Sequence, residues 1–275
     1  MCYKNEFSVL ISIYHKENAS FFSAALKSIW DDQEVKPNEI VIVQDGKLTD
    51  ELYCVIDNFK QRISCNLIII NLKNNVGLGL ALNEGLKHCT NELVARMDTD
   101  DISLPERFKE QLTAFKDMDI DICGTNLLEF SDDESVIDSV KKVPESNSEI
   151  IKFARYRNPI NHPTVMFKKS KIMNIGGYQH FLWFEDYYLW ARAIQAKYIF
   201  YNIQQPLIKM RTGNNMISRR HGIKYAKQEI KFQNFLLSIG LISVFIWISN
   251  IFTRIIPRLL PVKILSVIYK LLRKG

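Results

Sequence analysis

The sequence predicts an α/β fold: a mixed, mostly parallel sheet with helices on both faces, followed by a helical C-terminal tail. Short apolar runs rich in β-branched residues recur along the first half of the chain, and helical patterns and glycine turns separate them. The 275 residues are enough for one large domain with a hydrophobic core. A composition of 47% hydrophobic and 24% charged residues excludes a disordered or collagen-like chain.

Strands and helices alternate from the N-terminus. The run Phe7–Tyr14 predicts the first strand, which stops at the polar residues that follow it. Asn18 or Ser20 then suits the N-cap of a helix with apolar side chains on one face. Further strands are predicted at 39–43, 67–72 and 93–97. This spacing indicates parallel strands wound with helices.

The second half of the chain contains fewer regular patterns. Its predicted elements are a strand within 119–130, a polar loop or hairpin at 131–148, turn residues and a strand at 158–170, and a Gly-Gly turn, an aromatic loop and a helix at 176–194.

Three aspartates follow the predicted strand at 93–97. Ligands of open α/β sheets bind beyond the carboxyl ends of the strands, so the position of Asp98, Asp100 and Asp101 favours a function. Two carboxylates that flank one residue can hold Mg²⁺ or Mn²⁺, whose other ligands are water and substrate phosphate oxygens. Arg96, on the same side of the strand as Asp98, would compensate part of the charge. The alternative is an acidic N-cap of the next helix, which accounts for one aspartate but poorly for three.

The net charge of +6 belongs to the C-terminal tail. Seven of the 36 basic residues lie after Glu229, and none of the 30 acidic residues does. Residues 1–229 therefore hold 30 acidic and 29 basic residues. A nucleic-acid partner is therefore not predicted, because it would call for a basic face on the folded domain. The five cysteines are scattered without a C-x-x-C pair, which indicates reduced thiols rather than a metal or disulfide framework.

A second acidic pair lies inside an aromatic stretch, FLWFEDYYLW. Glu185 and Asp186 are the only acidic residues between Glu149 and Glu229. Aromatic surroundings desolvate a carboxylate and raise its pKa, which suits a general base that works near neutral pH. Trp183 offers a flat face on which a ligand ring can stack, and the alternative, which is commoner for such a run, is an aromatic core patch. A helix N-cap is the alternative for either carboxylate alone.

Six stretches together resemble a known family. FSVLISIYHKE, EIVIVQDG, NNVGLGLALNEGL, ARMDTDDISLPERF, NHPTVMFKKS and GGY…FEDYYLWARA resemble, in this order, the motifs of the inverting family 2 glycosyltransferases with the GT-A fold, a Rossmann-like fold. They are most similar to bacterial enzymes that extend O-antigen or exopolysaccharide repeat units. The resemblance covers roughly residues 6–220.

The resemblance implies a nucleotide-sugar donor, most often a UDP-sugar. Tyr14 and Glu17 would lie near the nucleotide, and Asp45 would accept a hydrogen bond from the base. Asp98 would lie near the ribose and the metal, and Asp100 would bind the metal, Mn²⁺ or Mg²⁺, that bridges the donor diphosphate. The remaining predicted donor-binding residues are Asn83 and Arg96. Many relatives carry arginine just before the position of Asn83, where this chain has leucine, so a donor contact from that position is in doubt.

For the acceptor, the resemblance implies a base in the second acidic pair. Asp186 would remove the proton from the acceptor hydroxyl, which attacks the anomeric carbon from the face opposite the leaving nucleotide and inverts its configuration. Glu185 is the alternative base or an acceptor contact. His162 and Arg211 fall where relatives place residues that face the acceptor or the diphosphate.

The tail is predicted to associate with a membrane. Phe235–Phe252 contains 18 residues without a charge, the lower limit for a membrane span, and from Val262 basic side chains fall on one helical face. We expect a catalytic domain at 1–230 and a segment at 231–275 that lies in the cytoplasmic leaflet. The alternatives are a true span, or a helical pair that packs on the domain or in a homodimer.

The sequence thus predicts a metal-dependent inverting glycosyltransferase, peripheral on the cytoplasmic face of the bacterial inner membrane, with a lipid-linked (polyprenyl diphosphate) saccharide as acceptor. Two other classes stay open: a nucleotidyltransferase that acts on a sugar phosphate, and a non-catalytic nucleotide-sugar-binding scaffold protein. The first usually carries a glycine-rich basic loop after its first strand, where this chain has YHKENASFF.

Overall fold

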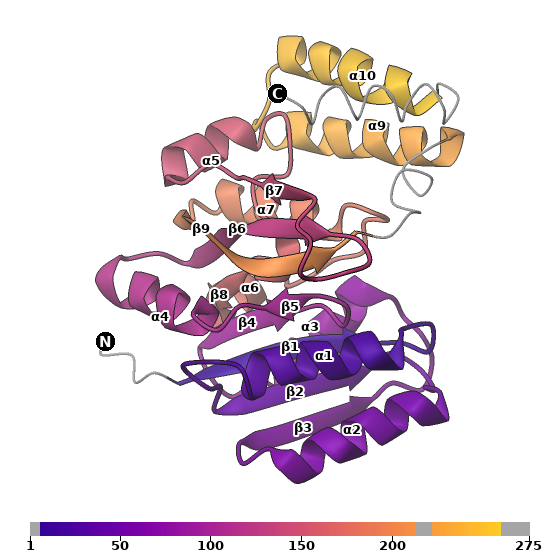
Figure 1. The fold of residues 1–275 in the computed structure, drawn as a ribbon. Helices are drawn as coiled ribbons and strands as arrows, with labels where there is room; N and C mark the ends of the chain where they lie inside the picture. The colour runs from indigo at the N-terminus through magenta and orange to yellow at the C-terminus, as the bar shows by residue number, and fades with distance from the viewer. Residues whose placement is uncertain (1–5, 213–221, 260–275) are drawn as a thin grey trace.

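The computed structural model describes residues 6–212 and 222–259. Its centre is one nine-stranded sheet in the order β3-β2-β1-β4-β8-β6-β9-β5, with β7 paired to β6 (Figure 1). The strands are β1 Phe7–Ile13, β2 Glu39–Gln44, β3 Asn66–Asn71, β4 Leu93–Met97, β5 Ile102–Ser103, β6 Ile122–Phe130, β7 Ser139–Lys141, β8 Met166–Lys168 and β9 Phe200–Arg211. The helices are α1 Ala19–Trp30, α2 Asp50–Arg62, α3 Leu78–His88, α4 Arg107–Asp117, α5 Asn147–Phe153, η1 His162–Thr164 (a 3₁₀ helix), α6 Lys169–Asn174, α7 Glu185–Gln195, α9 Ile223–Ser238 and α10 Val244–Leu259.

The predicted mixed and mostly parallel sheet is confirmed. Strands β1 to β4 are parallel to one another, and β6 is parallel to β9. Strand β8 enters antiparallel between β4 and β6. Strand order reverses beside β1, since the chain adds β2 and β3 on one side of it and β4 on the other. A ligand site is therefore expected beyond the carboxyl ends of β1 and β4.

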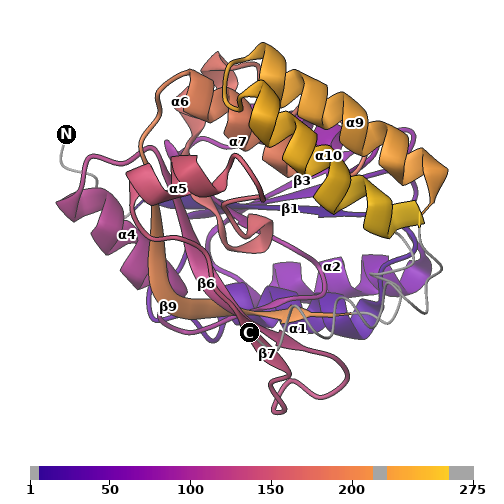
Figure 2. The same ribbon diagram turned by 90° about the horizontal axis from the view of Figure 1, so that it is seen from above.

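Helices cover both faces of the sheet, and the alternation of side chains along β1 shows why (Figure 2). Phe7, Val9 and Ile11 lie in a buried cluster with apolar side chains of α1, α2 and α4. Leu10 points the other way, into a cluster built with α3, α6 and α7. Strands β1, β2 and β4 are thus buried on both faces, which is why they read as continuous apolar runs in the sequence.

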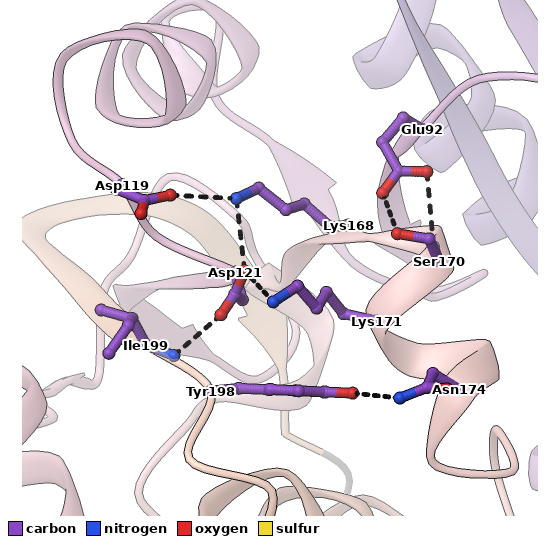
Figure 3. Close-up of polar contacts among 9 residues, drawn as sticks. All are labelled: Glu92, Asp119, Asp121, Lys168, Ser170, Lys171, Asn174, Tyr198 and Ile199. Atoms are coloured by element: carbon purple, nitrogen blue, oxygen red, sulfur yellow. Dashed lines mark hydrogen bonds and ion pairs between the residues drawn. The ribbon is translucent and has the colours of Figure 1, made fainter. Parts of the chain in front are cut away.

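The antiparallel strand β8 is anchored by ion pairs at its carboxyl end (Figure 3). The carboxylate of Asp121 lies 3.2 Å from the ammonium of Lys168 and 3.3 Å from that of Lys171, and it accepts the backbone N–H of Ile199 at 3.0 Å. Burial favours the neutral acid, but these donors prevail and hold the pKa of Asp121 below its usual value. The contacts fix β8 and α6, and so the loop that precedes them, against the centre of the sheet.

The C-terminal part forms a helical hairpin at the end of the molecule farthest from α2 and β3 (Figure 1). Gly240, at φ +72°, lies in the turn between α9 and α10 and divides the uncharged run Phe235–Phe252. Phe232 and Leu236 are fully buried against the side chains of α7. The chain forms the packed helical pair that was an alternative in the sequence, and association of the tail with a membrane stays a prediction.

Among the described residues, none of the helices combines the length and apolar character that a membrane crossing requires. The predicted boundary between residues 230 and 231 falls inside α9, which continues to Ser238. The basic helical pattern from Val262 onward lies outside the described residues.

Candidate active site

The three aspartates lie at the carboxyl end of β4, where the sheet topology places a ligand site. Each of Asp98, Asp100 and Asp101 offers a carboxylate oxygen, and these oxygens all lie within 4.8 Å of one another. The guanidinium of Arg96, itself 2% exposed, donates to both oxygens of Asp98. Burial, and the neighbouring carboxylates after it, raise the pKa of Asp100 and raise that of Asp101 well above its usual value. A cluster of this kind favours the binding of a divalent cation.

The aspartates do not cap the next helix, so that alternative is wrong. Helix α4 begins after Glu106, whose side chain makes no capping bond. Asp101 instead accepts the backbone N–H of Arg211 at 2.9 Å, which ties the cluster to the end of β9. The three carboxylates therefore belong to the loop at the carboxyl end of β4 and do not cap a helix.

A second buried arginine, Arg107, contacts the backbone of the strand that precedes the cluster. Arg107 is fully buried and donates to the carbonyl of Arg96 at 2.7 Å and to that of Pro163 at 3.3 Å. Burial, and the positive charge of Arg96 after it, lower the pKa of Arg107 to about 9. It thus holds the aspartate strand and the loop after residue 160 together, a role that no pattern in the sequence indicates.

The second acidic pair lies in the first turn of α7. Phe184 occupies the N-cap position without a side-chain cap, so neither Glu185 nor Asp186 is the N-cap. Asp186 accepts the side-chain amide of Asn158 at 2.6 Å and the backbone N–H of Tyr187 at 2.7 Å. Burial, and the adjacent Asp186 to a smaller extent, raise the pKa of Glu185, as the aromatic surroundings predicted for this pair.

The two acidic groups face one cavity of approximately 420 Å³. Eight of the residues predicted from the sequence line it: Arg96, Asp98, Asp100, Asp101, His162, Glu185, Asp186 and Arg211. Gly79 of α3 also lines it and lies directly against the side chain of Glu185, since a methyl group added at Gly79 would lie 3.3 Å from Cγ of Glu185. Carboxylates from two separate parts of the chain thus line one cavity of a size suited to a small ligand.

His162 and Arg211 reach the cavity through different arrangements. The ring of His162 shares a hydrogen bond of 2.9 Å between Nε2 and the hydroxyl of Tyr178, and burial, then Arg96, lower its pKa well below the usual value, so the ring is neutral. Arg211 lies over the rings of Phe21 and Phe130, with its guanidinium carbon 3.8 and 4.5 Å from their centroids. One is a neutral polar contact, and the other is a cation held on aromatic faces.

Five predicted residues lie outside the described lining of this cavity. Tyr14 and Glu17 follow β1 on its terminal loop, on the expected side of the sheet. Asp45 accepts the backbone N–H groups of residues 76 and 77 at 2.6 and 3.0 Å and so shapes the loop before α3. Trp183, at φ +70°, packs on Tyr225 with ring centroids 5.2 Å apart.

Asn83 is the fifth of these residues. Its carbonyl oxygen is buried against Gly177 and has no hydrogen-bond partner among the described residues. The roles of these five in donor or sugar binding stay predictions.

Comparison with known proteins identifies the family of this chain. The profile of the family described as "Glycosyl transferase family 2" matches residues 8–182, which is more than half of the chain. The chain belongs to glycosyl transferase family 2. The matched range ends just before Glu185, so the family profile covers the aspartate cluster and His162 but stops short of the second acidic pair.

Relatives extend the match to almost the whole length of this family 2 chain. It is 42% identical over 266 residues to "UDP-Gal:alpha-D-GlcNAc-diphosphoundecaprenol beta-1,3-galactosyltransferase" of Escherichia coli, covering 96% of this chain and 95% of that protein. It is 38% identical over 270 residues to "Amylovoran biosynthesis glycosyltransferase AmsE" of Erwinia amylovora, covering 98% and 100%.

Among solved structures, S. aureus TarS 1-349 in complex with UDP-GlcNAc superimposes with a TM-score of 0.66 at 16% identity, covering 90% of this chain and 72% of that one. A Pyrobaculum calidifontis mannosyltransferase in complex with GDP-Man and Mn²⁺ gives a TM-score of 0.62 at 15% identity, covering 84% and 64%. These likenesses confirm the predicted GT-A fold.

Proposed function

We propose that this family 2 glycosyltransferase moves a sugar, with inversion, from a UDP-sugar to a saccharide on a polyprenyl diphosphate lipid, in bacterial surface polysaccharide synthesis. The observation that carries the proposal is that the cluster after β4 and the pair at the start of α7 line one cavity. The E. coli relative, whose printed name contains a UDP-linked donor and a diphosphoundecaprenol acceptor, supports the two substrate classes. Family membership favours glycosyl transfer over nucleotidyl transfer.

The aspartate cluster fits a divalent cation, Mn²⁺ or Mg²⁺. Its donor set consists of carboxylate oxygens only, which hard cations prefer, and Asp98 and Asp100 are the residues that would hold the ion. A cation bound there would neutralise charge on the donor diphosphate as the nucleotide leaves. Arg96 keeps Asp98 in place, and Arg211 adds a fixed positive charge to the same cavity wall.

Asp186 acts as the general base in this proposal. Its carboxylate lines the same cavity as the aspartate cluster, at the start of α7, where it can accept the proton of an acceptor hydroxyl. The hydroxyl oxygen then attacks the anomeric carbon on the face opposite the nucleotide, so the configuration inverts in one displacement. Glu185, which is half-buried beside Asp186, is suited to hold the acceptor.

The hairpin supports attachment to the cytoplasmic face of the inner membrane. The outer side of α10 exposes an apolar stripe of Phe245 at 84%, Ile248 at 42%, Phe252 at 59% and Ile256 at 50%. Helix α9 exposes Lys224, Lys227 and Lys231. Apolar side chains with basic residues nearby are typical of proteins that lie on an anionic leaflet. A homodimer stays a prediction.

The membrane proposal is tested on the full chain with anionic vesicles. Phe245→Ser with Phe252→Ser should lower the sedimented fraction, while an exposed polar substitution on the same helix, Thr253→Ser, should not. Removing the hairpin is a poor test, because α9 fills the core beside α7. Equal binding by both variants would overturn attachment through α10.

Transfer is tested with UDP-sugars and a synthetic lipid-diphosphate saccharide, with the anomeric configuration of the product read by NMR. Asp186→Asn should abolish turnover and leave UDP binding intact, as expected if only proton removal is lost. EDTA should stop transfer, and added Mn²⁺ or Mg²⁺ should restore it. Retained configuration or unchanged turnover of Asp186→Asn would reject the mechanism, and UDP binding without transfer to any acceptor would favour the scaffold alternative.

A further inference from the structure

Helix α5 ends at Phe153, and side chains from other elements bind the carbonyl groups of the turn that follows it. Ala154 is the C-cap residue, whose carbonyl has no partner within the helix. Here the carbonyl of Ala154 accepts the hydroxyl of Tyr187 on α7 at 2.7 Å. The next two carbonyls, at positions 155 and 156, accept the side chains of Asn250 at 2.8 Å and Arg254 at 2.6 Å, both on α10. Three consecutive peptide groups are thus fixed by α7 and the hairpin.

The side chains of the hairpin that make these bonds are themselves held in a buried polar network. Arg254 pairs with Glu229 of α9 through two contacts, at 2.6 and 3.2 Å, and Glu229 is fully buried. Gln233 donates to Glu229 at 3.0 Å and accepts from Asn250 at 2.9 Å. A paired and hydrogen-bonded buried charge resists displacement, because moving one partner leaves the other without compensation. The network therefore fixes the hairpin against the end of α5.

Asn158, two residues after this fixed segment, contacts the proposed base. Asn158 accepts the backbone N–H of Ile160 through its carbonyl oxygen at 3.3 Å and donates from its amide nitrogen to Asp186 at 2.6 Å. The first contact determines which end of the amide faces Asp186. The other oxygen of Asp186 accepts the backbone N–H of Tyr187, so the carboxylate is held from two sides.

The geometry points to Asn158 as a positioning residue for Asp186, held in register by the α9–α10 hairpin through Asn250 and Arg254. This inference rests on the proposed role of Asp186 as general base. The amide does not touch the substrate; it fixes the rotation of the carboxylate that receives the proton. A displacement of about 1 Å at such a group can cost about 10²-fold in rate. The hairpin is accordingly part of the catalytic domain, whether or not it also contacts a membrane.

Two substitutions at Asn158 separate a positioning role from a role in the local turn. Asn158→Asp keeps the oxygen that accepts from Ile160 but replaces the donated N–H with a carboxylate oxygen that repels Asp186. We expect kcat to fall by about 10²-fold, with unchanged KM for the donor, unchanged UDP binding and a thermal midpoint close to that of the wild type. Asn158→Ala should lose less, about tenfold, because it removes the donor without adding repulsion.

The matched control is Asn58→Asp, which adds the same charge at an exposed position of α2, at the far edge of the sheet. Wild-type kcat for Asn158→Asp would overturn the inference. If Asp186→Asn is inactive while Asn158→Asp is fully active, the proposed base stands and only the positioning role fails. If Asp186→Asn is active, the proposed function itself fails.

The part played by the hairpin is tested in the full chain with Asn250→Ser and with the double variant Glu229→Gln, Arg254→Met. The double variant removes both charges together, since loss of one partner alone would leave a buried charge that endangers folding. For both variants we expect kcat to fall by about tenfold or more with unchanged UDP binding. A folded variant with wild-type kcat would overturn the link between the hairpin and Asn158, and Asn250→Ser provides this measurement if the double variant does not fold.

Discussion

The aspartate cluster should make the protein without metal less stable than a variant with one charge fewer. We predict that Asp100→Asn raises the thermal midpoint in EDTA while it abolishes transfer. Two unit charges 4.8 Å apart, the largest separation within the cluster, repel by about 3.5 kcal/mol at an effective dielectric constant of about 20. Asp100 takes part in two such pairs, so its neutralisation removes about 7 kcal/mol of repulsion.

Two opposing effects reduce this figure. Asp100 also attracts Arg96 and Arg211, and the loss of these attractions offsets part of the gain. The raised pKa of Asp100, caused by burial and then by Asp98, means that the carboxyl takes up a proton more readily than in the unfolded chain. Below its folded pKa the wild-type side chain is neutral, as in the variant, so the advantage of Asp100→Asn should shrink as the pH falls. A net gain of about 2 kcal/mol near neutral pH, roughly 5 °C in midpoint, is expected.

The assay is thermal unfolding followed by circular dichroism, in EDTA and in increasing Mn²⁺. The wild-type midpoint should rise with Mn²⁺, because a ligand that binds the folded state stabilises it, and the midpoint of Asp100→Asn should not. Asp57→Asn, an exposed neutralisation on α2, is the matched control and should show the wild-type response to Mn²⁺. A lower midpoint for Asp100→Asn in EDTA, or a preserved response to Mn²⁺, would refute the reasoning.

Three further outcomes are expected. Phe232→Ala should lower the free energy of unfolding by about 3–5 kcal/mol in urea titrations, because this α9 side chain is fully buried against α7. A loss below about 1 kcal/mol would mean that the hairpin does not unfold cooperatively with the rest of the domain. Burial raises the pKa of Cys89 and Cys123 from 9.0 to about 12. The thiols of the unfolded chain therefore ionise first, and the free energy of unfolding should fall between pH 8 and pH 10 by about 1.4 kcal/mol per thiol. Replacing both cysteines by alanine should reduce this dependence of the unfolding free energy on pH. Gly177→Ala should destabilise the fold, since φ is +62° and the new methyl group would lie 1.9 Å from the carbonyl oxygen of Asn83; adding Asn83→Ala should restore part of the loss, and failure to do so would exclude this clash.

The sequence predicted the strands that consist of consecutive apolar residues. The strands at 39–43, 67–72 and 93–97 and the aspartates after the last of them are where they were expected. Strands β2 and β4 are buried on both faces and so need an unbroken apolar run, and the half-buried edge strand β3 carries one as well. Strand β9 was missed, although it has 12 residues. Its centre, Gln204–Pro206, is polar, and the pairing with β6 shifts register there, so no strand pattern is visible.

The sequence indicated the site residues that stand out by their charge. It did not indicate the residues whose role depends on contacts between distant parts of the chain. Three close aspartates and an acidic pair among aromatic residues are informative without a structure. Asn158 looked like an ordinary turn residue before proline, since its partner Asp186 is 28 positions away. The uncharged run of the tail also concealed its fold, because the ion pair that fixes the hairpin joins Glu229, which precedes the run, to Arg254, which follows it.

The contact between Gly79 and Glu185 has a consequence for substrate choice. The start of α3 and the start of α7 approach one another there with only hydrogen at the α-carbon between them, and both line the cavity. A methyl group at position 79 would require the side chain of Glu185 to give way by a few tenths of an ångström, and a larger side chain would take up more of the cavity. If the proposed function holds, a series of alanine, serine and valine at residue 79 would test whether this contact limits the size of the sugar that the cavity accepts.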